Sequence, residues 1–132
     1  MKMRRVWVVI GGLALAGCGG SGGGASTYTV TGSTSALQAA GWMPKSVVGM
    51  PHTASGVTQV GYLELTAPDG FGVDVQFLPN ASDAKEELAA AEKTMPGCHG
   101  ETAGNAMMFS RGDGHLVIPS KTLSALRGLL RA

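Results

Sequence analysis

The chain has 132 residues, and its 10 lysine and arginine side chains nearly balance 9 aspartates and glutamates, which gives a formal net charge of +1. This length fits a single domain, and the charge lacks the excess of positive residues that nucleic-acid-binding domains carry, so no nucleic-acid partner is expected. Aromatic residues make up only 5% of the chain, so the predicted core is built mainly from Val, Leu and Met.

The N-terminal segment has the layout of a secretory signal. Lys2, Arg4 and Arg5 form a basic tip, and an apolar run follows from Val6 to Ala16. This run is shorter than the roughly 20 residues that a helix needs to span a bilayer, so we do not expect a permanent transmembrane helix.

The apolar run ends in Leu15-Ala16-Gly17-Cys18. This tetrapeptide resembles the lipobox of bacterial lipoproteins, which is cut by signal peptidase II. The resemblance implies cleavage before Cys18, a diacylglyceryl group on its sulfur and acylation of the new amine. Because two or more acyl chains give stable anchoring, the resemblance implies a membrane partner through the lipid on Cys18, at the cell membrane or outer membrane on the extracytoplasmic side.

The predicted organisation is a signal peptide over 1–17, a lipidated cysteine with a Gly/Ser-rich tether over 18–27, and one small domain over 28–132. Removal of the signal lowers the lysine and arginine count from 10 to 7 against 9 acids, a formal charge of about −2. It also leaves Cys98 as the second of only two cysteines, without an intrachain partner.

The first elements of the domain are predicted from local signals. The alternating, β-prone residues 28–31 predict a short strand. Ser35 and Gln38 form a capping-box pattern, and Gly41 supplies a stop, which predicts a short helix between them before Trp42 turns back to the core. Residues 44–56, rich in Pro and Gly, predict a long loop with a brief strand at 47–48.

The clearest prediction is a β-hairpin, with strands over 60–65 and 71–77 joined by the turn residues Ala67 to Gly70. Alternation in the second strand places Asp74 and Gln76 on a wet face, and it places the apolar residues on a buried face: Phe71, Val73, Val75 and Phe77.

Two further helices and a second hairpin are predicted beyond it. Asn80 caps a helix that ends before Pro96-Gly97, and its stripe of Ala84, Leu88, Ala91 and Met95 predicts packing on the dry face of the first hairpin. Glu86 and Glu87 are assigned to the solvated start of this helix. Residues 107–109 and 116–118 predict two strands around a turn at 111–114, and Ser120 is predicted to cap a last helix that carries Leu123, Leu126 and Leu130.

The resulting order, β-α-β-β-α-β-β-α, predicts an α+β two-layer sandwich in which an antiparallel sheet carries helices on one face, roughly on a ferredoxin-like plan. The segment 36–42, the acidic and alanine-rich helix and the Gly104-Asn105 pair before an apolar strand resemble small secreted actinobacterial domains of unknown function. That resemblance implies no activity.

The most reactive pattern is Met95-Pro96-Gly97-Cys98-His99. A thiol next to an imidazole is a candidate nucleophile or soft-metal ligand, and the Met95 thioether suits Cu(I). The alternatives are a buried or spare thiol on a loop and an interchain disulfide through Cys98. Cys98 and His99 are thus the candidate metal or redox residues, and no cofactor is predicted.

No arrangement of residues predicts catalysis. The leading hypothesis is a non-enzymatic lipoprotein of the cell envelope that binds or scaffolds a ligand near the membrane. The alternatives are a copper or redox site at Cys98 and His99, and a hydrolytic enzyme with the 44–56 loop as a lid.

Overall fold

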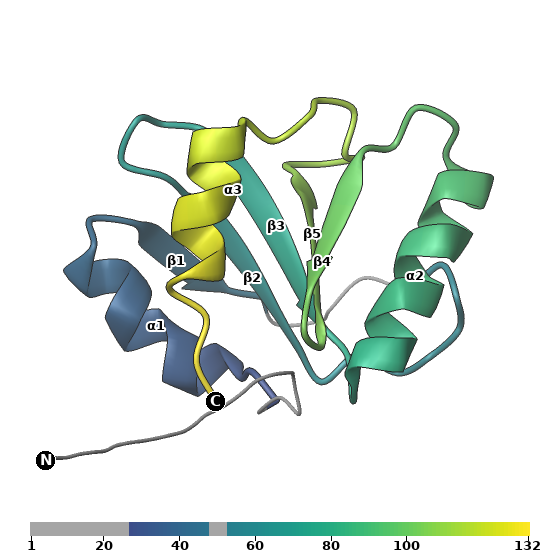
Figure 1. Cartoon of the computed structure of the whole chain (residues 1–132), viewed down its shortest axis with the longest axis horizontal. Coiled ribbons are helices and arrows are strands. Elements are labelled where there is room, and N and C mark those ends of the chain that lie inside the picture. Colours follow the sequence, from purple (N-terminus) through teal and green to yellow (C-terminus); the bar gives the residue numbers. More distant parts are fainter. Residues whose placement is uncertain (1–26, 48–52) are drawn as a thin grey trace, which may run out of the picture.

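The computed structural model describes residues 27–47 and 53–132, and Figure 1 shows how their helices and strands are arranged. The signal peptide predicted over 1–17, Cys18 and the tether up to residue 26 lie outside the described residues. The elements in chain order are α1 (Val30–Ala39), β1 (Met43–Ser46), β2 (Gly61–Thr66), β3 (Gly72–Phe77), α2 (Ala81–Thr94), β4 (Gly100–Ala103), β5 (Ala106–Ser110) and α3 (Ser120–Arg127).

The five strands form one antiparallel sheet in the order β1-β2-β3-β5-β4. Leu63 pairs with Val75, which pairs in turn with Met108, so these central strands place matching apolar residues side by side. The α+β class and the antiparallel sheet are therefore confirmed. The observed order, α-β-β-β-α-β-β-α, differs from the predicted β-α-β-β-α-β-β-α and does not follow the ferredoxin-like plan.

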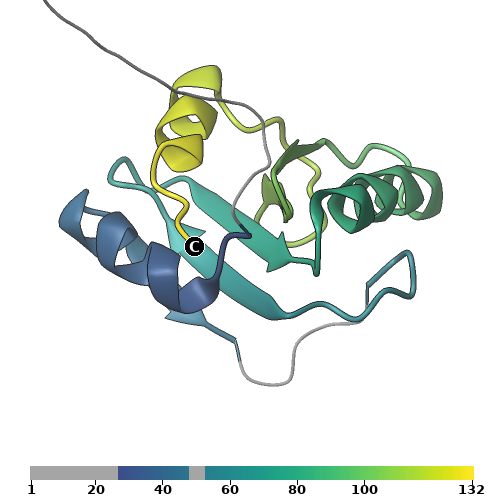
Figure 2. The same cartoon turned by 60° about the horizontal axis from the view of Figure 1, so that its bottom comes forward.

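Both faces of the sheet are covered. On one face, side chains of β2, β3 and β5 such as Leu63 and Val75 pack with Leu37 of α1 and Leu126 of α3. On the other face, Met107 of β5 packs with α2 and with the turn that follows it. The two views agree that α1 and α3 lie together and that α2 lies beside β4 and β5 (Figures 1 and 2).

The prediction that α2 covers the dry face of the hairpin was therefore wrong. Ala84 and Ala91 of α2 contact the face opposite to Val73. Asp74 and Gln76, predicted to be wet, are only 4% and 5% exposed. The alternating pattern of β3 identified the two faces correctly, but polar residues on the second face are also buried.

The strand predicted over 28–31 was also wrong, because a helix begins at Val30. The Thr29 side chain accepts a hydrogen bond from the Gly32 amide and caps α1, so the helix begins at Val30 and not near Ser35. The Asn105 side chain holds the backbone of Tyr28, accepting from its N–H at 2.7 Å and donating to its carbonyl at 3.0 Å. This long-range contact provides the hydrogen bonds that a strand would otherwise supply.

Several predictions that depend on contacts between residues close in sequence were confirmed. Asn80 accepts from the Asp83 amide at 2.8 Å and starts α2. Gly41 adopts a positive φ of 87° and ends the turn after α1, and Trp42 returns to the core with 4% of its surface exposed. The β2–β3 hairpin and its turn are present as predicted.

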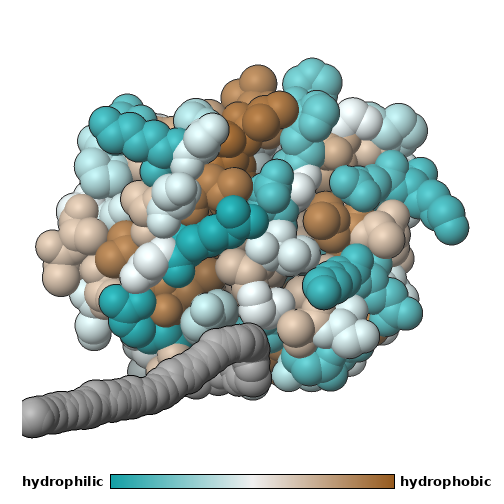
Figure 3. Space-filling model, viewed as in Figure 1, coloured by the Kyte–Doolittle hydropathy of each residue, from teal (hydrophilic) through white to brown (hydrophobic). Residues whose placement is uncertain are grey.

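The C-terminal third differs most from its prediction. The partner of β5 is β4, which precedes it, and residues 116–118 form no strand. Leu116 and Val117 are instead exposed. Figure 3, drawn in the view of Figure 1, shows apolar atoms at the top of the molecule, where the chain runs from β5 to α3. Pro119 occupies the N-cap position of α3 and offers no side-chain hydrogen bond, so Ser120 is not the cap.

The predicted 44–56 loop contains β1 at its start, which pairs with β2. The brief strand predicted at 47–48 is not found at Val47, and residue 48 lies outside the described residues. Within the described ranges, none of the helices has the length and apolar character needed to cross a membrane.

Candidate functional site

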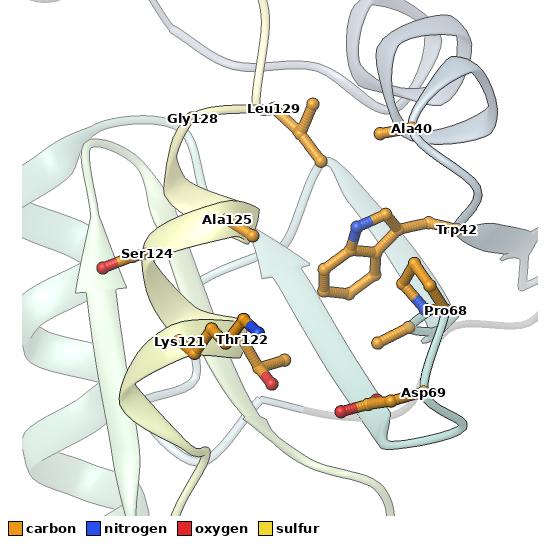
Figure 4. A pocket seen from close by; sticks show the side chains of 11 residues that line it. Ala40, Trp42, Pro68, Asp69, Lys121, Thr122, Ser124, Ala125, Gly128 and Leu129 are labelled. Atoms are coloured by element: carbon orange, nitrogen blue, oxygen red, sulfur yellow. The ribbon is translucent and has the colours of Figure 1, made fainter.

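A cleft with a volume of about 600 Å³ lies between the end of α1, the β2–β3 turn and α3. Figure 4 shows the side chains around it. Three separate segments of the chain form its walls: Ala40 and Trp42; Ala67, Pro68 and Asp69; and Lys121, Thr122, Ser124, Ala125, Gly128 and Leu129.

Trp42 is placed in this cleft by the end of α1. The Trp42 amide donates to the Leu37 carbonyl at 3.0 Å, which closes the last turn of the helix. The indole packs in the main core but still presents a surface to the cleft, between Ala40 and Pro68 in Figure 4. The sequence signal for this position was the Gly41 stop directly before a lone aromatic residue.

The two ends of the cleft differ chemically. Ala40, Trp42 and Leu129 make one end apolar, whereas Asp69, Lys121 and Thr122 lie together at the other end (Figure 4). The Asp69 carboxylate accepts from the Phe71 amide at 3.1 Å, so it is fixed by its own turn.

Lys121 is the cation at the polar end of the cleft. It takes part in neither of the ion pairs found among the described residues. It stands in the first turn of α3, whose cap makes no side-chain hydrogen bond, so the helix dipole adds positive potential at this end.

A second cavity of about 210 Å³ lies on the opposite face of the sheet. Its walls come from the loop before β2, from α2 and the turn after it, and from β3 and β5: Thr53, Ala54, Gln76, Glu87, Ala91, Thr94, Met95, Cys98, Met107 and Phe109. Sequence analysis had singled out Met95 and Cys98 but not their neighbours from β3 and β5.

Cys98 is a free, buried thiol that lines this second cavity. Burial raises the pKa of the thiol, and the nearby charges of Glu92 and Asp113 raise it further, so the thiolate is disfavoured. The adjacent His99 is exposed, and its amide donates to the Gly114 carbonyl at 2.8 Å. Among the described residues no group of three His, Cys, Asp or Glu side chains is arranged to hold a metal ion.

Glu87 forms part of the wall of the second cavity and is only 1% exposed, so its assignment to a solvated helix start was wrong. Its carboxylate accepts from the Ala54 amide at 3.0 Å, from the Ser55 amide at 2.9 Å and from the Ser55 hydroxyl at 2.7 Å. Glu87 therefore fastens the loop before β2 to α2. The sequence signal for its burial is its position three residues after Ala84, on the apolar stripe of α2.

A buried polar cluster lies on the same face, on β2 and β3. The Tyr62 hydroxyl donates to Asp74 Oδ2 at 2.9 Å, and Arg111 Nε lies 3.6 Å from Asp74 Oδ1. Burial raises the pKa of Asp74, although the hydrogen bonds from Tyr62 and Gly112 and the charge of Arg111 oppose the shift. Burial also raises the pKa of Tyr62, so the phenol stays protonated and acts as a donor. Arg111 also donates to the Leu65 carbonyl, so the cluster ties the turn after β5 to the sheet.

Comparison with known proteins gives no relative from which a role can be transferred, since no family model, no curated protein and no solved structure matches this chain.

Proposed function

We propose that the chain is a lipid-anchored lipoprotein of the cell envelope, and that its domain binds a small amphiphilic molecule in the α1–α3 cleft. The anchoring half is supported by the lipobox-like Leu15 to Cys18 and the basic, apolar segment before it. The observation that carries the binding half is the cleft of about 600 Å³ beside Trp42. Ligand pockets commonly have volumes of about 300 to 1,000 Å³.

The ligand class follows from the two ends of the cleft. Trp42, Ala40 and Leu129 offer an apolar surface that gains from covering an aliphatic or aromatic body. Lys121 offers a positive charge at the opposite end, next to the N-terminus of α3. We therefore expect an apolar body with an acidic or strongly hydrogen-bonding end group.

Binding or scaffolding is favoured over catalysis because the side chains around the cleft include no cysteine or histidine and no second carboxylate beside Asp69. The hydrolytic alternative needs a pocket with convergent reactive groups under the 44–56 loop. No observation favours it. Glu87 fixes Ala54 and Ser55 of this loop to α2 by hydrogen bonds from their amides.

The anchor is tested by fractionating the bacterial cells that express the full chain. We expect the protein in the membrane fraction, with a mass spectrum that shows an N-terminal peptide beginning at an acylated Cys18. Cys18→Ser is expected to abolish acylation and to release the domain from the membrane fraction if it is still exported. An intact signal peptide or an unmodified Cys18 in the membrane fraction would disprove the anchor.

The cleft is tested with the chain from residue 18, carrying Cys18→Ser so that it stays unlipidated. Of the two tryptophans, Trp7 precedes this start, so Trp42 is the only fluorophore of its kind. Octanoate and octanol serve as probes because they share a chain and differ in the charged end. We expect saturable changes in Trp42 emission, with tighter binding of octanoate.

Matched variants separate the cleft from general surface effects. Lys121→Gln is expected to remove the preference for octanoate over octanol, while Lys85→Gln on the exposed side of α2 retains it. Ala125→Phe is expected to fill the cleft and weaken both probes. Equal affinity in the native chain and in Ala125→Phe would refute the assignment of the cleft as the binding site.

A further inference from the structure

We propose that the second cavity is a binding site for a soft monovalent metal cation, Cu(I), held by the sulfur atoms of Cys98, Met95 and Met107. The site lies on the face of the sheet opposite to the α1–α3 cleft, so it does not depend on the function proposed above. Thiolate and thioether sulfur atoms are the ligands that Cu(I) prefers.

Two of the three sulfur residues are brought together by one β-turn. The Cys98 amide donates to the Met95 carbonyl at 3.0 Å, and Gly97 has a positive φ of 93°. Pro96 and Gly97 thus occupy the central positions of a type II turn, a geometry that keeps the first and last Cα atoms within about 7 Å. The sequence Met-Pro-Gly-Cys therefore places a thioether and a thiol at the same edge of the cavity.

The third sulfur comes from the sheet. Met107 of β5 is 2% exposed and lines the same cavity, and it packs in the same cluster as Cys98. Its neighbour Met108 points to the opposite face, into the core with α1 and α3. The cavity thus receives sulfur side chains from α2's end, the turn and β5.

A second observation indicates that this cavity holds an occupant. Gln76 lines it, is 5% exposed, and its Oε1 atom is buried without a hydrogen-bond partner among the described residues. A buried acceptor without a donor is costly. A volume of about 210 Å³ is large enough for a metal ion together with water that donates to Gln76.

Charge balance favours a monovalent ion. Binding converts the Cys98 thiol and Cu(I) into a copper thiolate and releases one proton, so the net charge of the site does not change and no electron is transferred. Cys98 is only 8% exposed, so a site that gains no net charge on binding avoids the cost of burying one.

The test uses the chain from residue 18 with Cys18→Ser, so that Cys98 is its only thiol. Cu(I) is kept reduced with ascorbate under nitrogen and titrated against a colorimetric Cu(I) chelator, and Ag(I) serves as a redox-silent probe. We expect one equivalent to bind, with an ultraviolet thiolate-to-metal band. Cys98→Ser should abolish the band and the tight binding.

Substitution of the methionines distinguishes a site with three sulfur ligands from binding by the Cys98 thiol alone. Met107→Leu and Met95→Leu should each weaken Cu(I) binding by about tenfold or more, since even the loss of a group that only supports a metal ligand has an effect of this size. Met108→Leu is the matched control, because it makes the same change at the next buried position of β5 but on the opposite face, and it should bind Cu(I) as the native chain does.

Three outcomes would overturn the proposal. These are tight binding that persists in Cys98→Ser, affinities in Met95→Leu and Met107→Leu that equal that of Met108→Leu, and the absence of stoichiometric binding, which would leave the cavity as a hydrated void. Urea unfolding of each variant identifies any loss of affinity that comes from loss of the fold.

Discussion

Glu87→Gln is predicted to detach the loop before β2 from α2 while leaving the rest of the domain folded. The native carboxylate accepts three hydrogen bonds, two at Oε1 from Ser55 and one at Oε2 from Ala54. An amide of the same shape retains one oxygen, which can keep the two bonds from Ser55. Its nitrogen then faces the Ala54 amide, donor against donor, so the third bond is lost.

The magnitude follows from these three bonds. The two retained bonds change from charged to neutral acceptors, which costs about 1 kcal/mol each, and the unpaired Ala54 amide costs about 1 to 3 kcal/mol. Part of this cost is offset, because the amide does not have to bury a charge. The net cost to loop closure is about 2 kcal/mol, which corresponds to a roughly 30-fold higher population of the open loop.

Alkylation of Cys98 measures this opening, because Ala54 and Cys98 line the same cavity. In the Cys18→Ser background, at fixed pH, we expect Glu87→Gln to label about 30-fold faster than the native chain. Glu86→Gln is the matched control, since it makes the same change at the adjacent, exposed position of α2. If the two variants label at the same rate, the Glu87 carboxylate does not hold the loop.

Two further predictions concern stability. Because burial raises the pKa of Asp74, its protonated form is favoured in the folded state: this contribution is fully present below the ordinary pKa of 3.8 and is lost as pH rises through the native value. Asp74→Asn should therefore flatten the fall in unfolding free energy as the pH rises above about 4, and an unchanged dependence on pH in urea titrations would contradict this. Asn105→Ala, which removes three hydrogen bonds to Tyr28 and Leu78, should cost about 3 kcal/mol. The Asn80→Ala cap variant should cost about 1 kcal/mol, and an equal loss in both would refute the role of Asn105.

Features whose partners lie a few residues away could be predicted from the sequence. The Asn80 cap is completed by Asp83, three residues on. The hairpin between β2 and β3 is closed by a short turn in which Asp69 accepts from Phe71. Such contacts need only the local chain, so residue types and spacing are sufficient to identify them.

Features that depend on distant partners could not be predicted in this way. Residues 28–31 have β propensity, but Tyr28 is held by Asn105, 77 positions away, and Thr29 is free to cap a helix. Glu87 looks like a solvated acid until the loop at Ala54 folds onto it. In each case a tertiary hydrogen bond outweighs a local propensity of a few tenths of a kcal/mol to about 1 kcal/mol.

The candidate metal site also combines nearby and distant residues. The sequence identified Cys98 and Met95, which are close in the chain, but it could not show that Met107 lines the same cavity. That connection requires knowing which face of β5 meets α2. Alternation along the strand sends Met107 to the second cavity and Met108 to the core beneath α1 and α3. Met107→Leu should therefore weaken Cu(I) binding and leave octanoate binding unchanged. If it weakens both equally, the variant has disturbed the sheet as a whole, and the loss of Cu(I) affinity then counts against Met107 as a ligand.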